Sequence, residues 1–447
     1  MTASAIHHRP HISPAGEIPD SVAAQLLRST CTYLTIAILV FGPLAFGAVE
    51  PWSMALLHIG SSVAFLLWLL ANVTSRRGSI DLQPIHLPPF LFACLVIGQI
   101  LLGGTVYHHD TVTEFLNYVA YGLIFLIATD LFRNEREARL LCLTLAVLGF
   151  GLAFLGSVQE FTSPEKLYWV RTPSQGGPIF GPYVNRNHYA GVMELLFPFA
   201  VLGSLKPGPS LSKRVMLGFA ALLMIATVFL CASRGGFVCV VLQSILLAMM
   251  LLWRSRRLSL VLSLTLLFIV TGAFGIWLGS DQLLGRLGHI GDDAGRVQIA
   301  RDSVRMFEHH PVTGWGLGTF PIAYPKFRTF ATDLFVNEAH NDFIQLLVET
   351  GVLGFAAGIG LLVLVYIGGF RKINRTLFGS WRSVAVGASL VGVTGLAVHS
   401  LFDFNLQIPA NALLFYVLCA VAGSNSEEDA QVVRRIDKDG VFSVIDV

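Results

Sequence analysis

Charged side chains are scarce in this sequence. Asp, Glu, Lys and Arg make up 13% of the 447 residues, whereas hydrophobic residues make up 54%. A soluble domain is about a quarter charged, so most of this chain is expected to lie in lipid. The formal net charge of +2 is nearly balanced and gives no reason to expect a nucleic-acid partner. The composition therefore indicates an integral membrane protein.

Several sequence patterns that would indicate other functions are missing. The six cysteines lie in or beside apolar runs, and their spacing suggests neither a zinc site nor a disulfide pair. The polar loops hold no Walker-type or Rossmann glycine pattern, which argues against a nucleotide cofactor. No internal repeat relates the two halves of the chain, which disfavours a secondary transporter.

Long apolar runs are what the sequence has in abundance. Runs of about 17 to 25 residues mark transmembrane helices, and the sequence predicts twelve of them: 31–49, 52–72, 85–103, 115–131, 140–159, 189–205, 215–232, 235–253, 258–278, 342–369, 383–401 and 410–423. Residues 1–30 are expected to form a lead, 279–341 a long loop with short helices, and 424–447 a tail. The predicted fold is an all-α integral membrane protein.

The distribution of Lys and Arg predicts the orientation of these spans. Alternate loops are basic, at 76–77, 133–139, 206–214, 254–257 and 371–382, and the short turns near 50, 108 and 402 have no Lys or Arg. By the positive-inside rule the basic loops and both termini are cytoplasmic. The loop at 279–341 is then outside.

Arg234 is placed against this bias, in a very short outward turn that reads SRGG from Ser233. An Arg at a helix mouth in a membrane is costly unless it is paired, so it is a functional candidate. Ser233 can cap the next helix, and the glycines allow another group to approach the backbone closely. A helix start with a guanidinium fork suits a phosphate.

A second polar cluster, GPYVNRNHYAG, lies at 181–191 before the sixth span. Asn185, Arg186 and Asn187 bring amides and a guanidinium to the outer face, and such groups suit sugar hydroxyls or phosphate. The alternative is a polar helix cap. Glu194 follows inside the span, where a carboxylate should face a cavity or a partner.

The long outward loop contains a predicted amphipathic helix. Val297, Val304 and their helical neighbours form a narrow apolar stripe with Arg296 and Arg301 on its flanks, and Pro311 ends the pattern. Such a helix would lie along the membrane interface with its arginines at headgroup depth. A plain solvated face is the alternative.

His340 stands where this loop returns to the membrane, among Glu338, Asn341 and Asp342. The unperturbed pKa of histidine suits proton transfer near neutral pH, so His340 is a candidate general base. A cap or an interface residue is the alternative. Glu349 would point to the opposite face of an ideal helix and is not expected to orient His340.

Three of these motifs, in this order, resemble the O-antigen ligase and bacterial polysaccharide polymerase (Wzy-C type) superfamily. They are SRGG at 233–236, the stretch from Arg296 to Pro311 followed by GWGLGTF, and AHNDFIQLLVETGVLG at 339–354. The resemblance covers roughly 185–423, including NRNHYAG and the DFNLQIP turn that begins at Asp403.

The resemblance implies a GT-C-like membrane enzyme of the bacterial inner membrane. It would transfer a glycan from undecaprenyl diphosphate to a sugar hydroxyl outside the cytoplasm, with no metal and no cofactor. Arg234 and Arg296 match the family's donor-diphosphate arginines, and His340 matches its acceptor-activating histidine. We add Arg301 to the donor site, and Glu338 and Asn341 to the glycan-binding candidates.

The acceptor stays open at this point. The lipid A core would make the protein an O-antigen ligase of lipopolysaccharide biosynthesis. A growing lipid-linked glycan would make it a Wzy-type polymerase of O-antigen or exopolysaccharide. Transfer to protein serines is a less favoured choice. A flippase or transporter for the same lipid-linked glycan would need a site open to both sides, whereas the polar groups gather at one face.

Overall fold

The computed structural model describes residues 21–75, 81–173, 178–255, 269, 291–331, 335–376 and 379–425. Over these residues the chain is helical, apart from loops and isolated bridges at Leu167–Arg171 and Phe180–Tyr183. Ten of the described helices are long and apolar enough to cross a membrane. The prediction of an all-α integral membrane protein is therefore confirmed.

Ten long helices make up most of the described chain. They are α1 (Val22–Leu44), α2 (Pro51–Thr74), α3 (Leu87–Leu101), α4 (His108–Leu131), α5 (Glu135–Thr162), α6 (Arg186–Leu205), α7 (Leu211–Leu230), α8 (Arg234–Ser255), α12 (Asp342–Arg375) and α13 (Trp381–His399). A shorter apolar helix, α14 (Pro409–Gly423), follows the 3-10 turn η4 (Asn405–Gln407). Each overlaps a predicted span, although α1 begins nine residues before the predicted 31–49. The predicted span at 258–278 lies outside the described residues except for residue 269.

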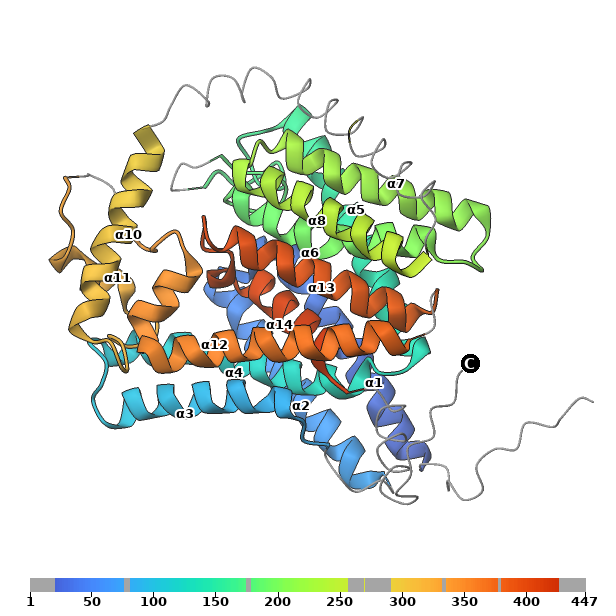
Figure 1. Cartoon of the computed structure of the whole chain (residues 1–447), viewed down its shortest axis with the longest axis horizontal. Helices are drawn as coiled ribbons and strands as arrows, with labels where there is room; N and C mark the ends of the chain where they lie inside the picture. The colour runs from blue at the N-terminus through green and yellow to red at the C-terminus, as the bar shows by residue number, and fades with distance from the viewer. Residues whose placement is uncertain are drawn as a thin grey trace, which may run out of the picture.

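The centre of the bundle is formed by α6, α13 and α14, and Figure 1 shows α13 and α14 between α8 and α12. The apolar stretch of α6 is 89% buried and that of α13 is 72% buried, against 22% for α12. In α14 almost every residue is buried. Because these central helices are covered on all sides, polar groups on them must find partners within the protein.

Beyond the start of α12, two further helices form a small unit, on the left in Figure 1. These are α10 (Gly291–His309) and α11 (Phe320–Ala323). A separate apolar cluster holds this unit together: Ile299, Met306, Phe320, Ala323, Tyr324, Ala339 and Val348. We call this side of the molecule the α10 end. The predicted stripe residues Val297 and Val304 are about half exposed, so they lie away from the protein core.

A break in α12 joins the α10 unit to the bundle. At Gly351 the backbone has φ +63°, and a Cβ there would lie 2.2 Å from the carbonyl oxygen of Val312, so only glycine fits. The loop fills the break, because Glu349 accepts hydrogen bonds from the backbone N–H of Gly318 (2.9 Å) and Phe320 (3.2 Å). Glu349 therefore holds the loop, in keeping with the expectation that it does not orient His340.

Candidate functional site

Asp403 is the centre of the polar site at the α10 end. It lies in the turn between α13 and η4, and its side chain is only 2% exposed. Its Oδ1 accepts a hydrogen bond from the Phe404 backbone N–H (2.9 Å), and its Oδ2 accepts one from the Asn187 amide at the start of α6 (2.6 Å). A buried carboxylate held by such donors is fixed in place.

Two histidines from different parts of the chain face the same carboxylate oxygen. His188 Nε2, on α6, and His340 Nδ1, in the loop before α12, each lie 3.8 Å from Asp403 Oδ1. This distance is too long for a hydrogen bond but short enough for an ion pair. The ring of Phe404 packs edge-on against both imidazoles, at 4.5 Å from His188 and 5.0 Å from His340.

The two histidines differ in their access to solvent. The side chain of His340 is 30% exposed, whereas that of His188 is 4% exposed. A general base must reach the proton that it abstracts. Of this pair, His340 is therefore the imidazole that a molecule from outside the protein can approach.

The backbone at His340 is unusual. Its φ is +52°, a left-handed conformation that is uncommon outside glycine. Both neighbours are tied down: the Ala339 N–H donates to Gln345 Oε1 (2.9 Å), and the Asn341 amide donates to the Leu401 carbonyl (2.9 Å) and caps α12. Such strain persists only where the surroundings hold it, as at functional sites.

Arg296 brings a positive charge to this site from α10. Its Nη1 donates to the Phe402 carbonyl (3.1 Å), and its Nη2 lies 4.0 Å from Asp403 Oδ2. The guanidinium is 41% exposed, so part of its donor fork faces outward. The structure thus brings together Arg296, His340 and Asn187, which were predicted separately, around Asp403.

The charges around Asp403 control its ionisation. Burial of the carboxyl group opposes the charged form, but His340, His188, Arg296 and His399 together outweigh it and hold the pKa of Asp403 well below its usual range. The site therefore contains a carboxylate that favours its ionised form, with Arg296 as its fixed positive partner.

The SRGG turn lies against the helix that leads to Asp403. Ser233 Oγ accepts from the Gly236 backbone N–H (3.2 Å), which confirms the predicted cap. A Cβ at Gly235 would lie 2.7 Å from Nε2 of His399, the last residue of α13, so the close approach predicted for the glycines is also confirmed. Arg234 is exposed at the first position of α8.

The remaining predicted residues have other local roles. Asn185 caps α6 by accepting from the Asn187 N–H (2.9 Å), and Arg186 is half-buried beside it. Arg301 is exposed on α10, on a different side of that helix from Arg296. Glu338 accepts a hydrogen bond from the Gln345 amide, and burial of its carboxyl group raises its pKa. The side chain of Glu338 therefore turns toward α12 rather than toward Asp403.

Two residues of this site were not among the candidate site residues chosen from the sequence. Asp403 entered only as the first residue of the DFNLQIP turn, and His188 only as part of the NRNH cluster. A carboxylate in a short outward turn without Lys or Arg was the available signal for Asp403. A histidine next to three hydrogen-bonding residues was the signal for His188.

Residues 219–359 match the Wzy-C family model, which describes O-antigen ligase. This part of the chain is therefore similar to the O-antigen ligase family. The matched residues include Arg234, Arg296 and His340. Asn187 and Phe404, which donate hydrogen bonds to the Asp403 carboxylate, lie outside the matched residues. A search of the curated proteins found no match to the chain.

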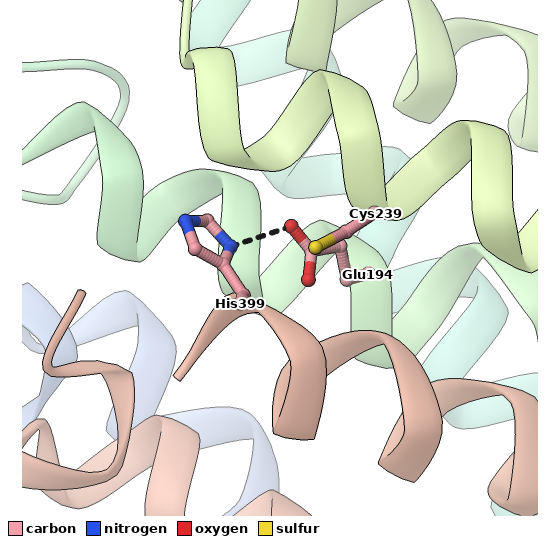
Figure 2. A group of neighbouring side chains, drawn as sticks. All are labelled: Glu194, Cys239 and His399. Carbon is pink, nitrogen blue, oxygen red and sulfur yellow. Dashed lines mark hydrogen bonds and ion pairs between the residues drawn. The ribbon is translucent and has the colours of Figure 1, made fainter. Parts of the chain in front are cut away.

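One group of described side chains near the Asp403 site has ligands suited to a metal ion. Glu194, Cys239 and His399 are all buried, and their ligand atoms lie within 4.8 Å of one another (Figure 2). Glu194 Oε1 and His399 Nδ1 are 2.7 Å apart, which is a direct hydrogen bond. The prediction that Glu194 faces a partner inside the membrane span is therefore confirmed.

Proposed function

We propose that this protein transfers a glycan from undecaprenyl diphosphate to a sugar hydroxyl on the lipid A core, as an O-antigen ligase on the outer face of the bacterial inner membrane. The match to the O-antigen ligase model supports the class of reaction. The observation that carries the mechanism is the approach of His340 to Asp403, with Arg296 on the other side of the carboxylate.

In the proposed reaction, His340 is the general base. Its Nδ1 faces Asp403, so Nε2 is the nitrogen that can receive the proton of the acceptor hydroxyl. The imidazole becomes positively charged in this step, and the ionised carboxylate stabilises that charge and fixes the ring. His188 contacts the same carboxylate but is buried, and it supports the carboxylate rather than the acceptor.

The donor loses a diphosphate in the same step. The acceptor oxygen forms a bond to the anomeric carbon, the bond from that carbon to the phosphate oxygen breaks, and the electron pair leaves on the diphosphate. Arg296 and Arg234 supply positive charge where this negative charge grows. Direct displacement inverts the anomeric centre. The donor is already activated, so no nucleotide takes part.

The two guanidiniums take the place that a divalent cation has in many diphosphate sites, because a fixed Arg fork binds phosphate oxygens in pairs. We therefore propose a reaction that is independent of metal. Arg301 and Arg186 are exposed or half-exposed at the same end and are assigned secondary contacts to the diphosphate and glycan.

The proposed orientation follows from the charge distribution. The basic residues Lys372 and Arg375 lie in the last turn of α12, whereas His340 lies just before its first turn. The positive-inside rule then puts both termini in the cytoplasm and His340 outside. Undecaprenyl-linked glycans would reach the site from the surrounding lipid.

The decisive experiment mixes purified protein in detergent with undecaprenyl-diphosphate-linked glycan and lipid A core. The expected result is glycosylated core from the wild type and none from His340→Ala, with both proteins binding the donor. A flippase would form no product without a membrane. In cells that lack the protein, free lipid-linked polymer supports a ligase, and single repeats attached to the core would indicate a polymerase instead.

A further inference from the structure

A pair of ionisable side chains lies next to the turn that carries Asp403. Glu194, two turns into α6, and His399, at the end of α13, are 0% and 1% exposed and make a 2.7 Å hydrogen bond (Figure 2). Ionisable groups inside a membrane protein are costly and are usually retained for function. The other carboxylate oxygen, Glu194 Oε2, is buried without a hydrogen-bond partner.

His399 holds the turn that forms the site. Its backbone carbonyl accepts hydrogen bonds from the N–H groups of Phe402 (2.8 Å) and Asp403 (3.1 Å). The Phe402 carbonyl in turn accepts a hydrogen bond from Arg296. The position of His399 therefore determines where the Asp403 carboxylate lies and where the Phe402 carbonyl, which binds Arg296, lies.

The other side of the same imidazole contacts the start of α8. The space that a Cβ at Gly235 would occupy is 2.7 Å from His399 Nε2, so the ring packs directly on the backbone next to Arg234. Glu194 holds that ring from the opposite nitrogen. A change in the ring position would displace both the Arg234 turn and the Asp403 turn.

We propose that the Glu194–His399 pair positions the start of α8, which carries Arg234, relative to the turn that carries Asp403. This inference rests on the proposed function, since the two elements form the donor and acceptor sides of one reaction. Glu194 and His399 are positioning residues and do not touch the substrates. Their role is to keep the diphosphate-binding charge at a fixed place relative to the general base.

A nearby polar residue provides a matched control. Gln243, two turns into α8, is buried and donates to the carbonyls of Glu194 (2.8 Å) and Val391 (3.0 Å). It ties together the same three helices through backbone carbonyls, and neither bond involves the His399 imidazole or the Glu194 carboxylate. If the Glu194–His399 pair mattered only for stability, Gln243→Ala and Glu194→Ala would change the kinetics equally whenever they lowered the unfolding temperature by the same amount.

The first test is steady-state transfer with purified full-length protein and varied donor. We expect Glu194→Ala to raise the donor KM and to lower kcat/KM on the order of 10- to 100-fold, because a shift of about 1 Å costs that much. Glu194→Gln should recover most of the loss, since its amide oxygen can accept the same bond. Equal effects from Gln243→Ala would overturn the proposal.

The second test is a double-mutant cycle between Gly235→Ala and His399→Ala. If the glycine acts through contact with the ring, Gly235→Ala should cost much less in the His399→Ala background. The cycle is measured through the unfolding temperatures of the four proteins, so it tests the contact without a transfer assay. A failure of the proposed function is distinguished separately, because the wild type would then form no product in the transfer assay. Additive effects would overturn the positioning role.

Metal analysis of the purified protein separates this proposal from a metal site. The expected result is no stoichiometric zinc and near-normal transfer by Cys239→Ala, because the thiol has no part in the hydrogen bond. Stoichiometric zinc that is lost in Cys239→Ala would show a metal centre at Glu194, Cys239 and His399 and would replace the positioning role.

Discussion

His340 Nδ1 lies 3.8 Å from Asp403 Oδ1, and this pair joins the loop before α12 to the turn after α13. The Asp342 backbone N–H donates to the Ser400 carbonyl (2.9 Å), so the two segments are also held together by main-chain bonding. The exposed imidazole is thus presented by a rigid frame, which is what a general base requires.

Exposure predicts different effects for the two histidines of the site. His340→Ala should lower kcat by roughly 10²- to 10⁴-fold, the usual contribution of a general base, and leave donor binding intact. His188→Ala should act mainly on stability, because its buried ring fills space beside Phe404. Single-turnover rates and donor binding, measured with both variants, check this. A slower chemical step in His188→Ala than in His340→Ala would reverse the assignment.

Asp403→Asn should lower turnover while keeping the fold. The asparagine can still accept from the Phe404 N–H, but it cannot stabilise a protonated imidazole, so we expect a loss of about 10²-fold or more in kcat. Asp130→Asn is the matched control, since Asp130 is partly buried, bonds Trp68 and pairs with Arg28 on other helices. Turnover by Asp403→Asn equal to that of this control would remove Asp403 from the reaction.

Arg296→Lys should raise the donor KM on the order of tenfold or more, because a lysine ammonium cannot bind two phosphate oxygens through a planar fork. Arg301→Ala is the comparison on the same helix, and its exposed position away from Arg296 predicts a smaller effect. Donor titrations with both variants measure the difference. An Arg301 effect as large as that of Arg296 would place the diphosphate further along α10.

The elements of this fold that depend on local sequence could be predicted. Apolar runs gave the span positions, and Ser233 with its glycines gave a correct cap and a correct close approach. The cap arises from contacts within one helix, whereas the glycines predicted only that some group would approach, and its identity as His399 of α13 depends on the fold. Hydropathy and capping rules describe contacts within one helix well.

The composition of the site depends on distant contacts and could be predicted only in part. Asp403 meets His340, His188 and Arg296 only after four segments fold together, and one sequence carries no signal of that meeting. Glu338 and Asn341 lie close to His340 in the chain, and in the structure they bond Gln345 and Leu401. Their part in glycan binding stays a prediction.

Removal of divalent ions should leave transfer unchanged. If Arg234 and Arg296 neutralise the leaving diphosphate, the reaction has no step that a metal must catalyse. Activity is measured before and after treatment with EDTA, followed by addition of Mg²⁺, Mn²⁺ or Zn²⁺. Loss of activity with EDTA and its recovery with one ion would contradict the scheme.

The ionised state of Asp403 predicts how stability depends on pH. Its pKa in the folded protein is below its unfolded value, because His340, His188 and Arg296 favour the charged form over the effect of burial. The fold therefore gains stability from this group at pH values above its unfolded pKa of about 3.9. That gain is lost as the pH falls toward the lower folded value. The difference in unfolding temperature between wild type and Asp403→Asn should shrink as the pH falls below about 4. A difference that grew below about pH 4 would mean that Asp403 is protonated in the folded protein, and the imidazole of His340 would then lack its anionic partner.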